Sequence, residues 1–347
     1  MKKLTVADKR KRKTIRIVFI LLLLLAVVGG LATVFYTPLD QLRSAMSVEK
    51  AADGRLLVMH YYGDYGFDDF LRRGLAANVN TALNLSNTSD WACTCFAAFG
   101  NEQDPLLGRN YDYTQVRPLI LFTDPPDGFA SVSMVDISFM SVYTQDLSWQ
   151  NRSRLLMAPY YPFDGMNEYG LGVGMMAIPL ADGGSDPQKV TIGSLQVIRL
   201  VLDHARNVTE AVGLLQGYNV DFSGGPPIHY LMADATGNSV VVEYLQGKPV
   251  VIHNDSSWQV ATNFILSGTG LETAESTCWR YKTAYETLQQ AKGLLTSGES
   301  MSLLNGVSQR ITSWSIVYGL ASGQIQLALD RDFEHVLDFD LEMQVDR

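Results

Sequence analysis

The 347-residue sequence predicts an α+β fold with antiparallel sheets, preceded by a transmembrane helix. Short strand patterns separated by turn residues dominate from residue 93 onward. The regular alternation of strands and helices that predicts a parallel sheet is absent, which favours layered antiparallel sheets. Only a few segments have the apolar spacing of an amphipathic helix. The hydrophobic content of 47% is that of an ordinary globular protein with a sizeable core.

The first 36 residues differ from the rest of the chain in charge and hydropathy. Residues 1–16 carry eight Lys or Arg residues and one acidic residue, whereas residues 17–36 carry no charge. Twenty uncharged residues at helical rise are long enough to cross a bilayer core. Because the basic cluster lies only on the N-terminal side, we expect a cytoplasmic tail at 1–16, a single membrane span at 17–36 and an extracytoplasmic body at the cell membrane. A cleaved signal peptide is the alternative, although its apolar region is usually shorter.

The body of the chain is acidic, because the net charge is −9 despite the basic N-terminus. This balance argues against a nucleic-acid partner, which would need basic patches. The histidines are scattered, and the three cysteines (Cys93, Cys95 and Cys278) form no CxxC pattern. We therefore predict no metal and no cofactor. An odd number of cysteines leaves at least one thiol free, and a Cys95–Cys278 disulfide stays open.

The periodicity of apolar residues predicts the individual elements. Strands are predicted at 55–62, 94–99, 106–113, 131–139, 170–179, 228–234, 239–244, 249–252, 260–264, 316–320 and 324–329. Helices are predicted at 68–82, 194–204, 208–215 and 275–291. Turn residues at 235–238 and 322–323 indicate hairpins between the strands that flank them. The polar residues 84–90 form a loop of the kind where chains are cut.

The stretch from Cys93 to Asp112 brings a thiol, a guanidinium and a carboxylate onto one predicted hairpin. Cys93 and Cys95 are two residues apart, so on a strand they point to the same face. Arg109 and Asp112 lie on the returning strand. Taken singly, a buried cysteine is usually a small hydrophobe and an Arg–Asp pair is usually a surface ion pair of little energy. A catalytic interpretation therefore needs a wider pattern.

The wider pattern resembles the choloylglycine hydrolase family, which includes bile salt hydrolases and penicillin V acylases. CTCF at Cys93 is followed by GRNYD at 108–112, and the spacing of cysteine, arginine and aspartate is that of the family. Further matches follow in order at 164–171 (DGMNEYGL), 228–243, 261–263 and 279–281, so the resemblance covers nearly the whole chain after residue 92. It implies an N-terminal-nucleophile hydrolase fold, a four-layer αββα sandwich of two antiparallel sheets. It also implies hydrolysis of a linear, non-peptide amide C–N bond.

The resemblance implies that Cys93 acts as the first residue of a mature chain. The Ala92–Cys93 bond would then be cleaved autoproteolytically, which makes residues 37–92 a pro-segment and residues 93–347 the catalytic domain. A free α-amino group has a pKa of about 7.7–8.0 and can exchange protons near neutral pH. An N-terminal cysteine thus supplies both the nucleophile and the base.

The resemblance assigns roles to four further catalytic residues. Arg109 is expected to lower the pKa of the thiol, and Asp112 to hold the α-ammonium group. Asn263 is expected to donate to the oxyanion, and Arg280 to orient Asp112 or the thiol. Bile salt hydrolases carry an asparagine where this sequence has Ala177. The main-chain N–H of Ala177 is the expected oxyanion donor there, and the change puts bile-salt specificity in doubt.

The substrate is expected to be a small N-acyl amide. Phe139, Met140, Tyr143 and Met175 suggest an apolar acyl site, although such residues are more often core. Bile salts, penicillins, acyl homoserine lactones and other N-acyl amines all stay open, and Cys95 is expected to be structural. Two alternatives remain: an acyltransferase with the same acyl-enzyme, and an unprocessed, non-catalytic binding protein anchored in the membrane. The sequence does not predict the oligomeric state.

Overall fold

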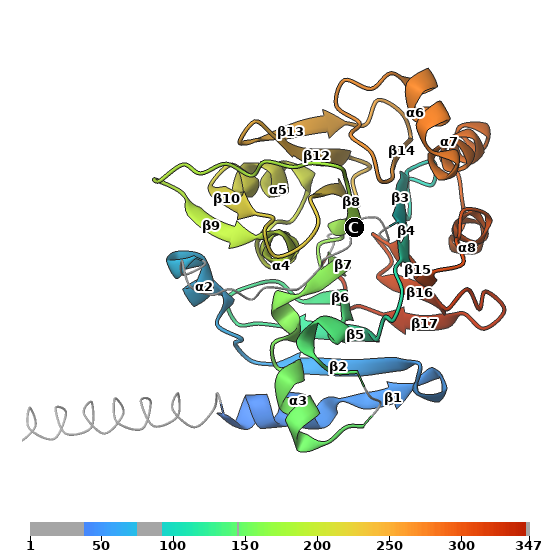
Figure 1. The fold of residues 1–347 in the computed structure, drawn as a ribbon. Helices are drawn as coiled ribbons and strands as arrows, with labels where there is room; N and C mark the ends of the chain where they lie inside the picture. The colour runs from blue at the N-terminus through green and yellow to red at the C-terminus, as the bar shows by residue number, and fades with distance from the viewer. Residues whose placement is uncertain (1–37, 75–91, 144–145, 345–347) are drawn as a thin grey trace, which may run out of the picture.

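The computed structural model describes residues 38–74, 92–143 and 146–344, and it confirms an α+β fold with two mainly antiparallel sheets (Figure 1). The larger sheet has the strand order β1-β2-β5-β6-β7-β8-β11-β12-β13, and the smaller has β14-β3-β4-β15-β16-β17. The predicted membrane span at 17–36 and the polar loop at 84–90 lie outside the described residues. None of the helices in the described ranges is both long and apolar enough to cross a membrane.

The element bounds are as follows. The larger sheet contains β1 (Glu49–Ala51), β2 (Leu56–Tyr62), β5 (Pro118–Asp124), β6 (Ser131–Asp136), β7 (Pro162–Asn167), β8 (Gly172–Ala177), β11 (Ile228–Ala233), β12 (Ser239–Leu245) and β13 (Lys248–His253). The smaller sheet contains β14 (Trp258–Ala261), β3 (Ala92–Ala98), β4 (Leu106–Asp112), β15 (Thr312–Gly319), β16 (Gln324–Leu329) and β17 (Leu337–Asp340). The strands β9 (Val190–Gly193) and β10 (Tyr218–Asp221) form a separate parallel pair.

The described helices are a helix at 38–47, α2 (Phe67–Arg73), α3 (Trp149–Leu155), α4 (Ser194–His204), α5 (Val208–Leu215), α6 (Leu271–Thr277), α7 (Trp279–Ala291) and α8 (Ser297–Gly306). Three short 3-10 helices join them: η1 (Ala52–Gly54), η3 (Ile137–Met140) and η4 (Ala158–Tyr160).

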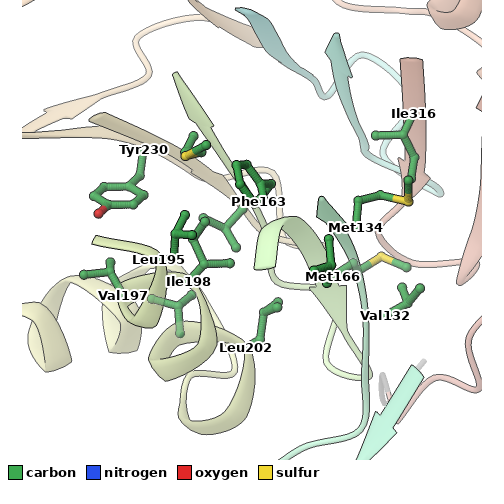
Figure 2. Packing of buried hydrophobic residues seen from close by; sticks show 14 of the residues in the cluster. Val132, Met134, Phe163, Met166, Leu195, Val197, Ile198, Leu202, Tyr230 and Ile316 are labelled. Atoms are coloured by element: carbon green, nitrogen blue, oxygen red, sulfur yellow. The ribbon is translucent and has the colours of Figure 1, made fainter. Parts of the chain in front are cut away.

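Helices cover the outer face of each sheet, so the layers run helix, sheet, sheet, helix (Figure 1). The helix α4 packs on β7 and β8, whereas α7 and α8 pack on β14, β3, β4 and β15. Figure 2 shows Ile198 and Leu202 of α4 on one side of the larger sheet and Ile316 of β15 on the other. A second cluster, which includes Phe96 and Leu288, fills the space between the smaller sheet and its helices.

Three predicted elements end where the backbone leaves its regular geometry. The helix predicted at 275–291 is two helices, because Cys278 is extended (φ −141°, ψ 113°). The helix predicted at 68–82 ends at Arg73, since Gly74 has a positive φ of 69°. The strand predicted at 131–139 ends at Asp136, whose carboxylate caps η3 by accepting from the Ser138 N–H.

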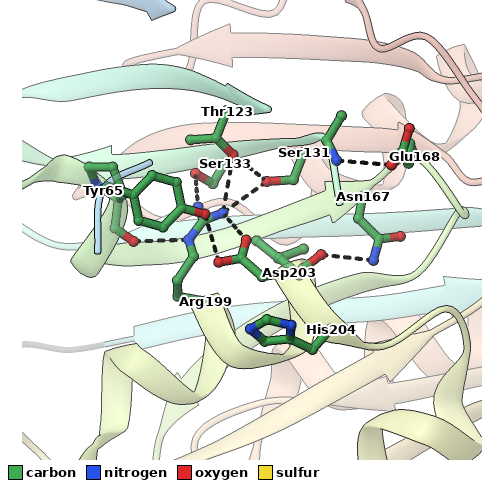
Figure 3. A network of polar contacts seen from close by, with 12 residues as sticks. Tyr65, Thr123, Ser131, Ser133, Asn167, Glu168, Arg199, Asp203 and His204 are labelled. Carbon is green, nitrogen blue, oxygen red and sulfur yellow. Dashed lines mark hydrogen bonds and ion pairs between the residues drawn. The ribbon is translucent and has the colours of Figure 1, made fainter. Parts of the chain in front are cut away.

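Residues 38–74, which the sequence assigned to a pro-segment, are part of the larger sheet. The strand β2 runs parallel to β5, next to it in the sheet. Beyond β2, the Tyr65 hydroxyl donates to Asp203 at 2.6 Å, and Asp203 pairs with the buried Arg199 at 2.9 Å (Figure 3). Arg199 also donates to Ser131 at 2.9 Å. Removing this segment would expose a sheet edge and a buried charge pair, so the fold depends on it.

Candidate active site

The β3–β4 hairpin has two faces with different surroundings. Cys93 and Cys95 stand opposite Tyr111 and Arg109 in the ladder, and these four side chains form the inner face, between the two sheets. That the two thiols share a face confirms the prediction from strand alternation. Thr94, Asn110 and Asp112 form the outer face, toward the helices of the smaller sheet. The hairpin therefore separates the thiol and guanidinium from the carboxylate that the sequence grouped with them.

On the inner face, Arg109 connects the thiol to a buried carboxylate. Its Nη2 atom donates to Cys93 Sγ at 3.7 Å, and its Nη1 atom donates to Asp164. Asp164 also accepts from Trp314 Nε1 at 3.1 Å and from the Tyr318 hydroxyl at 2.6 Å. Burial alone would lower the pKa of Arg109, but the negative charge of Asp164 raises it above its ordinary value. Arg109 is therefore a permanent cation beside the thiol.

Burial is the main influence on the pKa of both thiols. It raises the pKa of Cys93 above the ordinary value, and the positive charge of Arg109 opposes this rise only in part. Burial likewise raises the pKa of Cys95. Both thiols are fully buried and thus protonated near neutral pH. A nucleophilic thiolate needs a base close to Cys93.

The main chain of Cys93 is held by two residues from distant parts of the sequence. Its N–H donates to Asn263 Oδ1 at 2.6 Å, and its carbonyl accepts from Arg280 Nη1. Arg280 also donates to Thr94 Oγ1 and to Asn263 Oδ1, both at 2.9 Å. A basic residue near the start of a helix is usually a surface cation. Arg280 is not, because only 6% of it is exposed. The structure thus brings Asn263 and Arg280 to the bond that the sequence predicts to be cleaved.

Asp112 lies directly opposite Ala92 in the β3–β4 ladder. Its carboxylate accepts from Thr312 Oγ1 at 2.5 Å and from Gln309 Nε2 at 2.8 Å. The Arg280 guanidinium approaches it to 3.9 Å. Burial raises the pKa of Asp112, and these hydrogen bonds oppose the rise. The carboxylate is therefore adjacent to the Ala92–Cys93 bond although it shares no face with the thiol.

Ala177, at the end of β8, contacts the site through its carbonyl. This oxygen accepts from Asn263 Nδ2 at 2.8 Å. A side-chain amide carries two N–H donors, so Asn263 keeps a second one beyond this bond. Asn263 consequently links the end of β8 to the Cys93 main chain.

Sequence reasoning missed residues that shape the inner face. Asp164 belongs to the DGMNEYGL block but had no role assigned. It lies inside the fully buried strand β7, and a carboxylate that is buried in this way needs a partner. Gly174 of β8 faces the hairpin, and a Cβ there would lie 2.9 Å from Cys95 Sγ and 3.1 Å from Arg109 Cδ. Glycine at this position lets the larger sheet approach both side chains.

A buried pair supports the loop that carries Asn263. His229 Nδ1 lies 3.1 Å from Glu243 Oε1, and His229 Nε2 lies 2.7 Å from the Thr262 carbonyl. Glu243 also accepts from the main-chain N–H groups of Leu266 and Ser267, at 2.7 and 3.0 Å. These contacts fix the loop on both sides of Asn263. Both residues lie in the matched block 228–243, but they had no role assigned from the sequence.

The four residues predicted to bind substrate do not gather on one surface. Phe139 and Met140 lie half-buried in η3, and Phe139 stacks on Tyr113 at the end of β4, with ring centroids 6.2 Å apart. Tyr143 is 64% exposed, whereas Met175 is buried within β8. The structure therefore places Phe139 near the hairpin, and places Met175 in the core.

All three cysteines are free, so the Cys95–Cys278 disulfide is not formed. Within the described ranges, no three His, Cys, Asp or Glu side chains are grouped so that they could hold a metal ion.

In this α+β fold the buried Cys93 thiol lies beside the Arg109 guanidinium, which makes Cys93 a candidate nucleophile. Residues 93–265 match the family model described as linear amide C–N hydrolases, choloylglycine hydrolase family. By this match the chain belongs to the choloylglycine hydrolase family.

Sequence relatives and solved structures agree with this placement. The chain is 26% identical over 197 residues to a penicillin V acylase of Pectobacterium atrosepticum, which is 52% of each protein. It is 34% identical over 100 residues to an uncharacterized protein of Paramecium bursaria Chlorella virus 1, or 26% of this chain and 36% of that one. The chain thus spans about half or less of the length of these curated relatives.

Two solved structures share the fold at 17% identity. A mutant conjugated bile acid hydrolase from Clostridium perfringens superposes with a TM-score of 0.54 over 72% of this chain and 92% of that one. A penicillin V acylase from Agrobacterium tumefaciens superposes with a TM-score of 0.50 over 72% and 86%.

Proposed function

We propose that this protein hydrolyses the linear C–N amide bond of a small N-acyl substrate, with Cys93 as the nucleophile. One observation carries the proposal: Arg109 contacts the Cys93 thiol, while Asn263 and Arg280 hold the main chain of the same residue. A structural cysteine would need none of these three partners. The family match begins at Cys93 and supports the assignment.

The first step is cleavage of the Ala92–Cys93 bond. The Cys93 thiol adds to the Ala92 carbonyl, and the acyl group moves from nitrogen to sulfur while the thiol proton passes to the nitrogen. Water then hydrolyses the thioester, which leaves a carboxylate on Ala92 and a free α-amino group on Cys93. Hydrogen bonds from Arg280 to the Cys93 carbonyl and from the Cys93 N–H to Asn263 hold this peptide in place for the attack.

The second chemistry is turnover of the amide substrate. The α-amino group of Cys93 takes the thiol proton, and the thiolate, stabilised by Arg109, attacks the substrate carbonyl. The free N–H of Asn263 and the main-chain N–H of Ala177 receive the oxyanion, and one such donor is worth about 3–4 kcal/mol. The leaving amine takes the proton, and water releases the acid from the thioester. Asp112, opposite Ala92, holds the α-ammonium form between these steps.

Phe139 is the proposed contact for the acyl group, because the aromatic rings Tyr113, Tyr111 and Trp314 connect it to the inner face. Met140 and Tyr143 lie on the same segment, whereas Met175 is buried in the core and is not part of the proposed contact. The chain 38–74 stays attached after cleavage through β2 and the Arg199 network. Residues 17–36 are the proposed membrane span and residues 1–16 its cytoplasmic tail, with the catalytic domain outside the cell membrane.

Mass spectrometry of the purified full-length protein tests maturation. We expect a fragment that begins at Cys93 and is absent from the Cys93→Ala variant. Active protein with an intact Ala92–Cys93 bond would overturn the mechanism. Amine release from a panel of N-acyl amides then identifies the substrate class. A competing amine such as hydroxylamine separates hydrolase from acyltransferase, because only an acyltransferase would convert most of the acyl group into the new amide.

A further inference from the structure

The helix at 38–47 exposes three large apolar side chains, whereas the side that faces the protein carries two serines and the small Ala45. Leu39, Leu42 and Met46 are 58%, 42% and 68% exposed. Their spacing of three and four residues places them on one face of the helix. On the opposite face, the Ser44 hydroxyl accepts from the Tyr62 N–H at 2.8 Å, and the Ser47 hydroxyl donates to the His60 carbonyl at 2.8 Å. A surface helix in water normally has the reverse arrangement.

The helix α3 lies beside the 38–47 helix and adds further exposed apolar side chains. Arg152 of α3 donates to the carbonyls of Ala45 and Val48, at 2.7 and 3.1 Å, and so fixes α3 against the end of the 38–47 helix. Trp149, one turn earlier on α3, is 59% exposed, and Met157, just after α3, is 48% exposed. Figure 1 shows α3 beside this first helix. We call the set Leu39, Leu42, Met46, Trp149 and Met157 the apolar surface.

The neighbouring sequence indicates which partner covers the apolar surface. The helix begins directly after the uncharged residues 17–36, which are long enough to cross a bilayer. Leucine and methionine on one helical face, with a tryptophan beside them, are the residues that enter the headgroup region of a membrane. Arg43, on the edge of the same face, is exposed and lies over the Tyr62 ring at 3.7 Å. A basic side chain there suits anionic headgroups.

We propose that the apolar surface lies on the lipid bilayer and fixes the orientation of the domain above it. Arg152, Ser44 and Ser47 bind the 38–47 helix to the rest of the domain. Contact of this helix with the bilayer would therefore fix the orientation of the whole domain. With a single span at 17–36 as its only attachment, the domain could rotate relative to the membrane plane. The second contact, through the apolar surface, restricts that rotation.

The same surface adjoins the segment proposed to bind the acyl group. Arg154 of α3 donates to the Ser141 carbonyl at 2.8 Å, immediately after Phe139 and Met140. If the proposed amidase function holds, an acyl chain inserted in the membrane is close to this segment. The extension rests on that function and predicts a preference for membrane-borne N-acyl amides over short soluble ones.

Fluorescence quenching of the full-length protein in vesicles tests the lipid contact. The vesicles contain phosphatidylcholine with bromine on the upper acyl carbons, which quenches tryptophan at short range. Trp279 on α7 is a matched control, since it is 54% exposed and covers the smaller sheet. We expect Trp149→Phe to remove a clear part of the quenching, and Trp279→Phe to leave it as in the unaltered protein.

Equal quenching in the two variants would overturn the proposal. A second copy on the apolar surface would also overturn it, and would appear as a dimer that Met46→Glu dissociates, with no bromine quenching of Trp149.

For the extension, the triple variant Leu39→Gln, Leu42→Gln, Met46→Gln should lose several-fold activity on a vesicle-borne N-acyl amide and none on a short soluble one. If neither amide is hydrolysed by the unaltered protein, the proposed function fails, and the quenching result still decides the lipid contact.

Discussion

The two faces of the β3–β4 hairpin differ although they alternate along the same strands. The inner face holds the fully buried side chains of Cys93, Cys95 and Arg109, and Arg109 forms a buried ion pair with Asp164. The outer face holds Thr94 and Asp112, whose oxygen atoms accept hydrogen bonds from several partners. Arg109 and Asp112 are three positions apart on β4, and side chains at that spacing point to opposite faces of a strand. The carboxylate of Asp112 therefore cannot lie on the face that carries Arg109 and the Cys93 thiol.

The comparison teaches where the two faces can cooperate. The main chain of Cys93 is common to both, and it is there that Asn263 and Arg280 bind. A free α-amino group at Cys93 would lie on the strand axis, between the thiol on one face and Asp112 on the other. Cleavage before Cys93 is thus the step that would connect the faces.

Replacing each thiol separately should give the largest difference. We expect Cys93→Ala to lower kcat/KM for amide hydrolysis by more than about a thousandfold, because the nucleophile is lost. Cys95→Ala should lower it by less than about tenfold, since that thiol contributes packing only. The measurement is amine release by matched amounts of folded protein. Loss of activity in the Cys95 variant alone would reverse the assignment.

The buried ion pair should matter more for stability than the outer carboxylate does. Asp164→Asn leaves the Arg109 guanidinium buried without a countercharge, a change that costs about 3–5 kcal/mol. Asp112→Asn should cost less, about 1–2 kcal/mol, because its hydrogen-bond partners Thr312 and Gln309 are neutral. The Arg280 cation lies 3.9 Å away and keeps its hydrogen bonds to Thr94 and Asn263. Thermal unfolding of both variants in detergent compares them. A larger destabilisation by Asp112→Asn would contradict the assignment of the dominant charge pair to the inner face.

The contact of the inner face with β8 should have a smaller effect. Gly174→Ala places a Cβ 2.9 Å from Cys95 Sγ, and such overpacking costs about 1–3 kcal/mol. The double variant with Cys95→Ala should recover part of that loss, because the sulfur is removed. Gly213→Ala is the control, since a Cβ there meets nothing within 4 Å on α5 and a helical alanine is favourable. Equal destabilisation by both glycine variants would show that the inner face has room to spare.

Local patterns predicted the local parts of this architecture. Strand alternation placed Cys93 and Cys95 on one face, and the periodicity of 194–204 and 208–215 gave α4 and α5 with the correct bounds. The resemblance supplied Asn263 and Arg280, which no spacing argument could connect to Cys93 over more than 150 residues.

Long-range pairing could not be predicted from the sequence. Asp164 meets Arg109 only because β7 and β4 belong to facing sheets, and the stacking of two sheets leaves no local signal. The parallel pairing of β2 with β5 also leaves no local signal. For that reason the sequence placed residues 38–74 in a removable pro-segment, whereas they in fact complete the larger sheet. Thr312 and Gln309 reach Asp112 from a strand and a loop that lie 200 and 197 residues further along the chain.

A pH titration should give the smallest effect at the edge of the inner face. Burial raises the pKa of Asp136 to about 6, and its charge acts on Tyr111. An unfolded aspartate has a pKa of about 3.9, so between about pH 4 and 6 the folded protein binds more protons than the unfolded one. This carboxyl therefore adds stability as the pH falls through that window, and the contribution is lost as the pH rises to 6. Asp136→Asn should flatten the slope by up to about 1.4 kcal/mol per pH unit. Glu210→Gln is a control of opposite sign at the acid end of this range, because hydrogen bonds from Arg206 hold the pKa of Glu210 below its usual value and its contribution to stability is lost as the pH falls. Unfolding free energies from pH 4 to 7 that show the same slope with and without Asp136 would remove this carboxyl from the buried surroundings of Tyr111.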